Sequence, residues 1–148
     1  MNNELDAKLC AEFPDIFIQR NMDMKETCMC WGFECSDGWY QLIYDLCRVI
    51  ENHIQDVNFN IEYHKEAGII SEDEPTEAIA CHATQVKEKF GTLRFYTDYE
   101  DEYISGAISM AEHVSTHTCE VCGKQGKSRV NHGWYYVSCD EHMHKEES

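Results

Sequence analysis

The stretch TCEVCGKQGKSRVNHGWYYVSCDEH, residues 118–142, contains two pairs of metal-binding residue types. Cys119 and Cys122 form the first pair, and Cys139 and His142 form the second after sixteen intervening residues. Three thiolates and one imidazole with these two-residue gaps are typical of structural zinc sites, because each pair can reach the same ion. We therefore expect one zinc ion bound by these four side chains.

The residues between the two pairs predict the local fold. KSRVNHGWYYV reads as a β-hairpin that turns near Asn131–Gly133, and the second pair is expected to open a short C-terminal helix. A knuckle, a hairpin and a ligand-bearing helix are the parts of a treble-clef or ribbon-like zinc finger. Four protein ligands fill a tetrahedron and leave no position for water, so we expect a structural ion.

Two alternatives bear on this site. The four side chains can simply be buried thiols and a histidine, and His117, His132 or His144 can replace a ligand. The pair Asn131-His132 resembles nucleases built on a similar finger, so a metal-dependent nuclease is one alternative function. Such an enzyme needs an open metal position and acidic metal ligands, which the sequence does not identify.

Upstream of the cysteines, the sequence alternates between helical and strand periods. Apolar residues at three- and four-residue spacing indicate helices, alternation indicates strands, and Ser36 or Asp37 is a plausible helix N-cap. The expected helices cover residues 3–12, 39–55 and 101–115, and the expected strands cover 57–63, 79–90 and 92–97. We predict an α+β fold in which an antiparallel sheet of three or more strands packs against two helices.

The chain divides by composition into an acidic domain, residues 1–116, and a zinc-finger module, residues 117–148. The formal net charge of −16 comes from 28 acidic and 12 basic residues, of which 23 and 8 lie in the first part and 5 and 4 in the second. Such a field repels phosphate backbones and attracts basic surfaces. We expect a protein partner with a basic surface and no direct binding of nucleic acid.

Two acidic runs, SEDEPTE and DYEDE, are expected to be surface loops. They either aid solubility or form an anionic surface that imitates the phosphates of DNA. The candidate partner-binding residues in these runs are Glu72, Asp73, Glu74, Glu77, Asp98, Glu100, Asp101 and Glu102.

A small basic cluster, Lys87, Lys89 and Arg94, flanks Gly91. It either offsets the surrounding acids or holds a phosphate or nucleotide through a bidentate arginine. A sponge that sequesters a nucleotide signal is therefore a second alternative function.

Other cysteines raise the question of a second metal. The set Cys28, Cys30, Cys35 and Cys47 can bind an ion, but Cys-x-Cys is not a knuckle spacing and Cys47 falls among apolar helix positions. We favour packing of these thiols in the core.

The start of the chain, MNNELDAKLCAEFPDIF, has no basic leader followed by an apolar run, and no later stretch is apolar enough for a membrane helix. Without an export signal, nine cysteines favour metal binding in a reducing compartment over disulfides. We expect a cytoplasmic protein.

Three sequence blocks resemble a group of small, mostly uncharacterised bacteriophage and prophage proteins: CWGFECSDGWYQLI, then QVKEKFGTLRFY, then AEHVSTHTCEVCGKQG with GWYYVSCDEH. The resemblance covers residues 28–143. It implies a phage-type origin in a bacterial cytoplasm and supports the four zinc ligands, but it implies no activity. We expect a non-enzymatic binding protein that inhibits a host defence or nucleic-acid-handling protein through its anionic surface.

Overall fold

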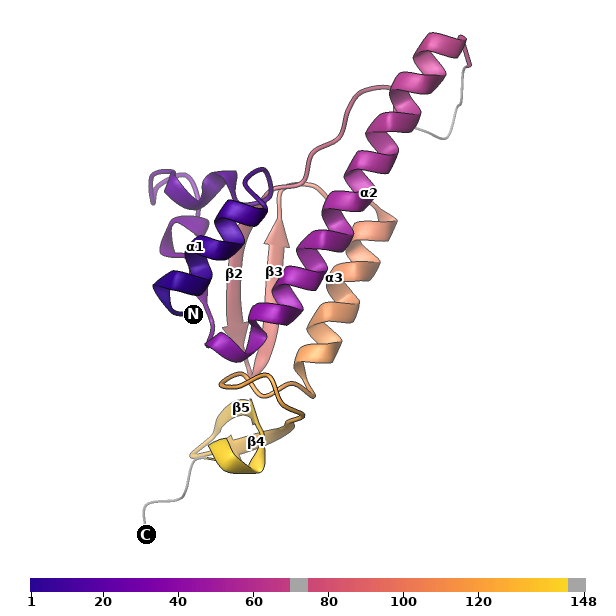
Figure 1. Ribbon diagram of the computed structural model, residues 1–148. Coiled ribbons are helices and arrows are strands. Elements are labelled where there is room, and N and C mark those ends of the chain that lie inside the picture. The colour runs from indigo at the N-terminus through magenta and orange to yellow at the C-terminus, as the bar shows by residue number, and fades with distance from the viewer. Residues whose placement is uncertain (70–74, 144–148) are drawn as a thin grey trace.

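A computed structural model describes residues 1–69 and 75–143. It confirms the α+β class, with three α-helices, a three-stranded sheet and a two-stranded sheet in this part of the chain. The elements are α1 (Asn3–Glu12), β1 (Phe33–Glu34), α2 (Tyr40–Ala67), β2 (Ala83–Lys89), β3 (Thr92–Thr97), α3 (Glu102–Ser115), β4 (Lys127–Asn131) and β5 (Trp134–Ser138). In Figure 1, α2 and α3 lie side by side along the larger sheet, and β4 and β5 lie beyond its lower end.

The hairpin expected around Gly91 is confirmed. Strands β2 and β3 pair antiparallel with Val86 opposite Phe95 and Lys87 opposite Arg94. Leu93 and Phe95 are buried on one face, as the alternation predicts. The third strand of the sheet is the two-residue β1, which pairs parallel to β2, so the sheet is mixed and not wholly antiparallel.

The strand expected at residues 57–63 is wrong, because this segment continues α2 to Ala67. Ile50, Ile54, Val57 and Ile61 recur at three- and four-residue spacing, which continues the helical period through the segment, and no Gly or Pro interrupts the helix before Gly68. This part of α2 also contacts a distant segment. The Asn58 side chain donates to Ile79 O at 2.9 Å and accepts a hydrogen bond from Ile79 N–H at 2.8 Å.

Helix α3 lies where the sequence predicted it and protects the free edge of the sheet. Asp101 caps its N-terminus by accepting a hydrogen bond from Ile104 N–H at 2.8 Å. At the other end, the hydroxyl of Ser115 accepts a hydrogen bond from Leu93 N–H at 2.9 Å, and Glu112 accepts one from Phe95 N–H at 3.3 Å. Edge N–H groups that are paired in this way cannot recruit another strand.

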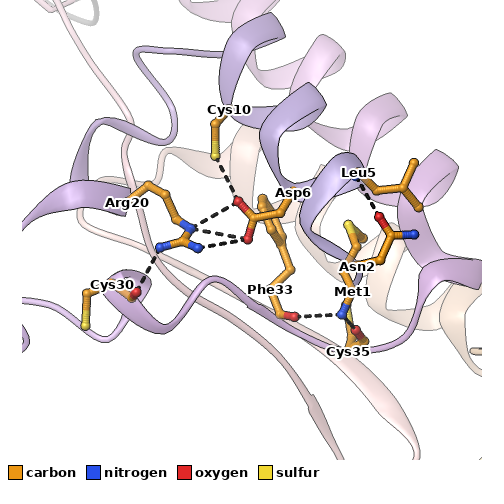
Figure 2. A network of polar contacts seen from close by, with 9 residues as sticks. All are labelled: Met1, Asn2, Leu5, Asp6, Cys10, Arg20, Cys30, Phe33 and Cys35. Atoms are coloured by element: carbon orange, nitrogen blue, oxygen red, sulfur yellow. Dashed lines mark hydrogen bonds and ion pairs between the residues drawn. The ribbon is translucent and has the colours of Figure 1, made fainter.

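Figure 2 shows how the first helix is tied to the segment that contains β1. Arg20 forms an ion pair with Asp6 of α1, with Nη2 and Oδ2 3.1 Å apart, and donates to Cys30 O at 2.9 Å. The amino group of Met1 donates to Phe33 O at 3.1 Å. Residues 13–35 have little regular structure, yet these contacts fix them against α1 and the sheet.

The core is formed by all these elements except β4 and β5. Trp39 is fully buried and lies one residue before α2, whereas the predicted cap Asp37 binds Asn2 instead of the helix backbone. Neither Ser36 nor Asp37 caps α2. The buried cluster contains Leu9, Phe13, Ile16, Phe17, Met29, Phe33, Cys35, Trp39, Ile43, Leu46, Cys47, Ile50, Cys81, Ala83, Val86, Leu93, Phe95, Ile104, Ile108 and Ala111.

Candidate metal centre

The structure brings the four predicted ligands together. The ligand atoms of Cys119, Cys122, Cys139 and His142 all lie within 4.8 Å of one another. Among residues 1–69 and 75–143, this is the group of histidine, cysteine and acidic side chains close enough to hold a metal ion. The first pair follows α3 in a tight turn, in which Gly123 N–H donates to Cys119 O at 2.8 Å.

The second pair is positioned by the hairpin of β4 and β5. This hairpin turns at His132 and Gly133, both with positive φ, as a type I′ two-residue turn requires. Cys139 directly follows β5, and residues Asp140–His142 form a single 3-10 turn in place of the expected short helix. Cys122 Sγ lies 3.7 Å from Cys139 Sγ, and His142 Nδ1 lies 3.7 Å from Cys119 Sγ and 3.3 Å from Cys139 Sγ.

The backbone around Cys119 favours its thiolate. Burial raises the pKa of this thiol. Hydrogen bonds from the backbone N–H groups of Cys139, Cys122 and Val121 together lower it by more, so the pKa is about 6. A backbone hydrogen bond from Lys124 lowers the pKa of Cys122, but burial and the neighbouring thiols outweigh it and raise that pKa. Metal ligation needs thiolates, and a bound cation favours them at all these positions.

The metal-binding turn rests on a glycine that sequence analysis did not single out. Gly38 N–H donates to Glu120 O at 2.7 Å. A Cβ atom at Gly38 would lie 2.3 Å from Cys119 O and 2.5 Å from Gly123 N, so only glycine allows this approach. The neighbouring Trp39 indole N–H donates to Thr118 O at 3.0 Å. The segment before α2 therefore packs against the turn that contains Cys119 and Cys122 and supports it.

A second contact joins the finger to the larger sheet. Gly91, in the turn between β2 and β3, has a φ of 78°, and a Cβ atom there would lie 3.0 Å from the backbone of Tyr136 in β5. The first two sequence blocks of the resemblance, which contain Gly38 and Gly91, thus each contact the third. Helix α3 ends at Ser115, one residue before the expected boundary, and close backbone approaches at Gly38 and Gly91 join residues on its two sides.

The two alternative histidine ligands that the structure describes, His117 and His132, lie elsewhere. His117 contacts Thr116 Oγ1 through Nδ1 at 2.7 Å and packs against the ring of His113. His132 lies at the tip of the hairpin, separated from Cys139 by the whole of β5. His144 lies outside the described residues. This placement gives the nuclease alternative no support.

The remaining cysteines are mostly packed or hydrogen-bonded. Cys35 and Cys47 belong to the core, where burial raises the pKa of Cys35 to about 12 and that of Cys47 well above its usual value. Cys30 Sγ lies 3.2 Å from Thr27 O, and Cys28 is exposed. The structure therefore scatters the four cysteines that raised the question of a second metal.

The basic cluster is only partly available to an anion. Lys87 and Arg94 are cross-strand neighbours, as the hairpin predicts. Arg94 already contacts Glu112, with Nη1 and Oε2 3.6 Å apart, and the ammonium of Lys89 lies 5.7 Å from the centre of the Phe90 ring. An incoming nucleotide would have to compete with Glu112 for the arginine.

The candidate acidic residues have different roles. Asp98 pairs with His82, with Oδ2 and Nδ1 2.7 Å apart, and Asp101 caps α3 and contacts His53 at 2.6 Å. Glu77, Glu100 and Glu102 are exposed. Residues Glu72, Asp73 and Glu74 lie outside the described residues. Part of the second acidic run is therefore structural, and the remainder faces solvent.

Within the described residues, no helix is both long enough and apolar enough to cross a membrane. Comparisons with family models, curated proteins and solved structures give no match to this chain. Conclusions about function therefore depend on the metal centre and on the distribution of charge.

Proposed function

We propose that this protein is a non-enzymatic binding protein of bacteriophage type that carries one structural zinc ion. In this proposal it acts in the cytoplasm of a bacterial host, where it inhibits a defence or nucleic-acid-handling protein by covering its basic surface. The uneven distribution of charge carries the proposal: 23 of the 28 acidic residues lie in 1–116, with only 8 of the 12 basic ones. A strongly anionic body attracts basic surfaces and speeds their association.

The distances between the ligand atoms support zinc as the ion. Metal–sulfur bonds of about 2.3 Å and metal–nitrogen bonds of about 2.0 Å give a tetrahedron with sulfur–sulfur edges of about 3.8 Å and sulfur–nitrogen edges of about 3.5 Å. Three of the six separations, one Sγ–Sγ of 3.7 Å and two Sγ–Nδ1 of 3.3 and 3.7 Å, agree with these edges, and all six are within 4.8 Å. Three thiolates and an imidazole also suit the softness of zinc.

A structural role for the ion follows from its complete set of protein ligands. Cys119, Cys122, Cys139 and His142 would supply all four ligands of a tetrahedral ion, which would leave no position for a water nucleophile. The ligand-bearing turn is also hydrogen-bonded to Gly38 and Trp39. Zinc in this position holds the finger against the body of the protein.

Partner capture from bacterial lysate tests the binding role. Because the attraction is electrostatic, the captured protein should be lost when salt is raised from about 50 mM to about 500 mM. A variant with Glu74, Glu77 and Glu100 changed to glutamine should capture at least fivefold less, whereas a matched control with Asp15→Asn, Glu26→Gln and Glu66→Gln should behave as the parent. A salt-insensitive partner, or equal losses in both variants, would contradict the proposal.

A further inference from the structure

An apolar groove runs between α2 and α3, with a volume of about 530 Å³. The two helices lie side by side and run in opposite directions, so the groove follows both axes (Figure 1). The apolar side chains that line it are chiefly Leu42, Leu46 and Val49 on α2 and Tyr103, Ala107 and Met110 on α3. Its walls are formed by residues that recur every three or four positions, which is the spacing of ridges that another helix can fit.

The floor of this groove is buried, as Leu46 and Ala111 show, but part of its apolar lining is exposed to solvent. Met110 is 63% exposed and Tyr103 is 56% exposed. The Tyr103 ring stacks on His53, with ring centres 4.2 Å apart and planes inclined by 13°, so one end of the groove is held in place before any ligand binds. A contiguous exposed apolar patch of this kind marks an interaction site more often than a passive surface.

Gly106 lines the groove at a position where the described residues leave room for a larger side chain. It lies in the interior of α3 and lines the groove, yet a Cβ atom there would meet nothing within 4 Å. Glycine weakens a helix relative to alanine, and no contact within the described residues requires it at this position. Glycine at this position leaves the backbone of α3 open to the groove.

The two carboxylates that line the groove indicate the charge of its ligand. Asp45 comes from α2 and Glu102 from α3. Asp45 accepts a hydrogen bond from the Gln41 amide at 2.8 Å, and neither acid forms an ion pair within residues 1–69 and 75–143. On another part of α2, by contrast, Arg48 binds Glu51. Cationic groups on a ligand would complete both unpaired sites.

We propose that this groove binds an amphipathic helix of a partner protein, with an apolar stripe flanked by lysine or arginine side chains. The helix would insert its apolar side chains over Gly106, between Val49 and Met110, and place its cations beside Asp45 and Glu102. A second copy of this chain fits poorly, because it would bring like charges together on molecules of net charge −16. The inference rests on the proposed function for the basic character of the partner.

A model peptide tests the groove directly. The probe is a fluorescently labelled helical peptide of about 18 residues, long enough to form several turns, with leucine at three- and four-residue spacing and lysine elsewhere. We expect saturable binding, which is absent for the same peptide with glutamate in place of lysine and at least fivefold weaker for a scrambled leucine–lysine peptide. Equal binding of the scrambled peptide would overturn the proposal, since charge alone would then explain it.

Gly106→Ala separates a docking role from a structural one. Alanine should raise the melting temperature by about 2 to 4 °C through helix propensity, and it should weaken peptide binding at least fivefold by filling the groove floor. Asp45→Asn with Glu102→Gln should weaken binding at least fivefold as well, whereas the matched pair Asp15→Asn with Glu26→Gln should change it less than twofold. Unchanged binding to the Gly106→Ala protein, or equal effects of the two charge variants, would refute the groove.

The same variants distinguish this inference from the proposed function. If lysate capture fails after loss of Glu74, Glu77 and Glu100 but survives Gly106→Ala and Asp45→Asn with Glu102→Gln, the anionic binding role stands and the groove proposal is wrong. If the peptide binds as expected but no salt-sensitive host protein is captured, the groove stands and the proposed function fails. Self-association in sedimentation that Gly106→Ala abolishes would identify a second copy as the occupant and overturn the proposal of a cationic helix.

Discussion

The body of the protein and its finger are stabilised in different ways. The body, residues 1–116, contains the whole buried cluster of twenty apolar and cysteine side chains. In the described part of the finger, residues 117–143, the buried side chains are Cys119, Val137, Ser138 and Cys139. A single buried valine cannot offset the entropy of ordering this segment, so we expect the finger to depend on a bound ion and on its contacts with the body.

The cysteines show the same difference at the level of single residues. In the body, burial raises the pKa of Cys35 and of Cys81 to about 12, so these thiols stay neutral and pack as small apolar groups. In the finger, backbone N–H groups lower the pKa of Cys119 to about 6 despite burial, which favours a metal-binding thiolate. Burial alone therefore does not set the pKa of a cysteine in this protein, because backbone hydrogen bonds outweigh it at Cys119.

Removal of the metal should have the largest effect and should be confined to the finger. Structural zinc contributes on the order of 10 kcal/mol to the folding of isolated fingers. We expect chelation or Cys119→Ser to abolish metal binding and to collapse the amide NMR signals of residues 127–139, while those of β2 and β3 persist. Cys28→Ser, at an exposed cysteine, is the control and should keep one ion per chain. If the finger stays folded without metal, its stability does not depend on the ion and the contrast with the body is wrong.

Truncation of a core side chain should destabilise the body and leave the metal-binding finger intact. Leu93 is fully buried in the centre of the body. Leu93→Ala should lower the free energy of unfolding by about 2 to 5 kcal/mol, because it removes buried apolar surface and leaves a cavity. Urea denaturation measures this loss, and elemental analysis should still find the metal. Val121→Ala, at an exposed position in the finger, should cost less than about 0.5 kcal/mol; an equal cost would mean that the two regions share one core.

A substitution at the junction tests how far the two regions are coupled. Gly38→Ala would place a methyl group 2.3 Å from Cys119 O, and the resulting displacement should cost about 1 to 3 kcal/mol. We expect metal affinity to fall together with stability, as a competition titration with a chelator can measure. Gln41→Ala, at an exposed site one turn away, should affect neither. If Gly38→Ala leaves the metal affinity unchanged, the finger binds the ion without support from the segment before α2.

The smallest effect should be an opposite response to pH. Below pH 6, protons compete with the metal for Cys119, so the finger should lose its ion as pH falls. The thiols of Cys35 and Cys81 have raised pKa values in the folded protein, so the unfolded chain loses these protons first and the body should weaken as pH rises above about 9. Each thiol contributes at most about 1.4 kcal/mol per pH unit. Cys81→Ala should reduce the alkaline slope in thermal unfolding; an unchanged slope would exclude this cause.

Part of the fold was predictable because it depends on near neighbours in the chain. The hairpin of β2 and β3, helix α3 and the four clustered ligands all follow from short spacings that backbone geometry converts into one face or one turn. The segment 57–63 shows the limit of this approach. Val57 and Ile61 fit both the helical and the strand period, whereas Phe59 and Tyr63 fit only the strand period and are exposed in the helix. The uninterrupted continuation from α2, with Asn58 bound to Ile79, accompanies the helical outcome.

The sites that the sequence did not reveal depend on distant contacts. Gly38 reads as an ordinary turn glycine until Cys119 O and Gly123 N are placed against it. Arg94 reads as a free cation until Glu112 reaches it from α3. The strand β1 is only two residues long, too short for any periodic signal. None of these partners lies close enough in the chain to leave a local pattern.

The sequence by itself determined the ligand set, the acidic character of the body and the apolar stripes of its helices, because residue type and spacing are properties of the chain. Only the tertiary structure decided where these features meet. The finger packs against Gly38 and Gly91, and the apolar stripes of α2 and α3 line the two sides of an open groove. The physical reason is that a helix or turn follows from interactions over a few residues, whereas a supporting contact or a groove exists only when separate surfaces pack together.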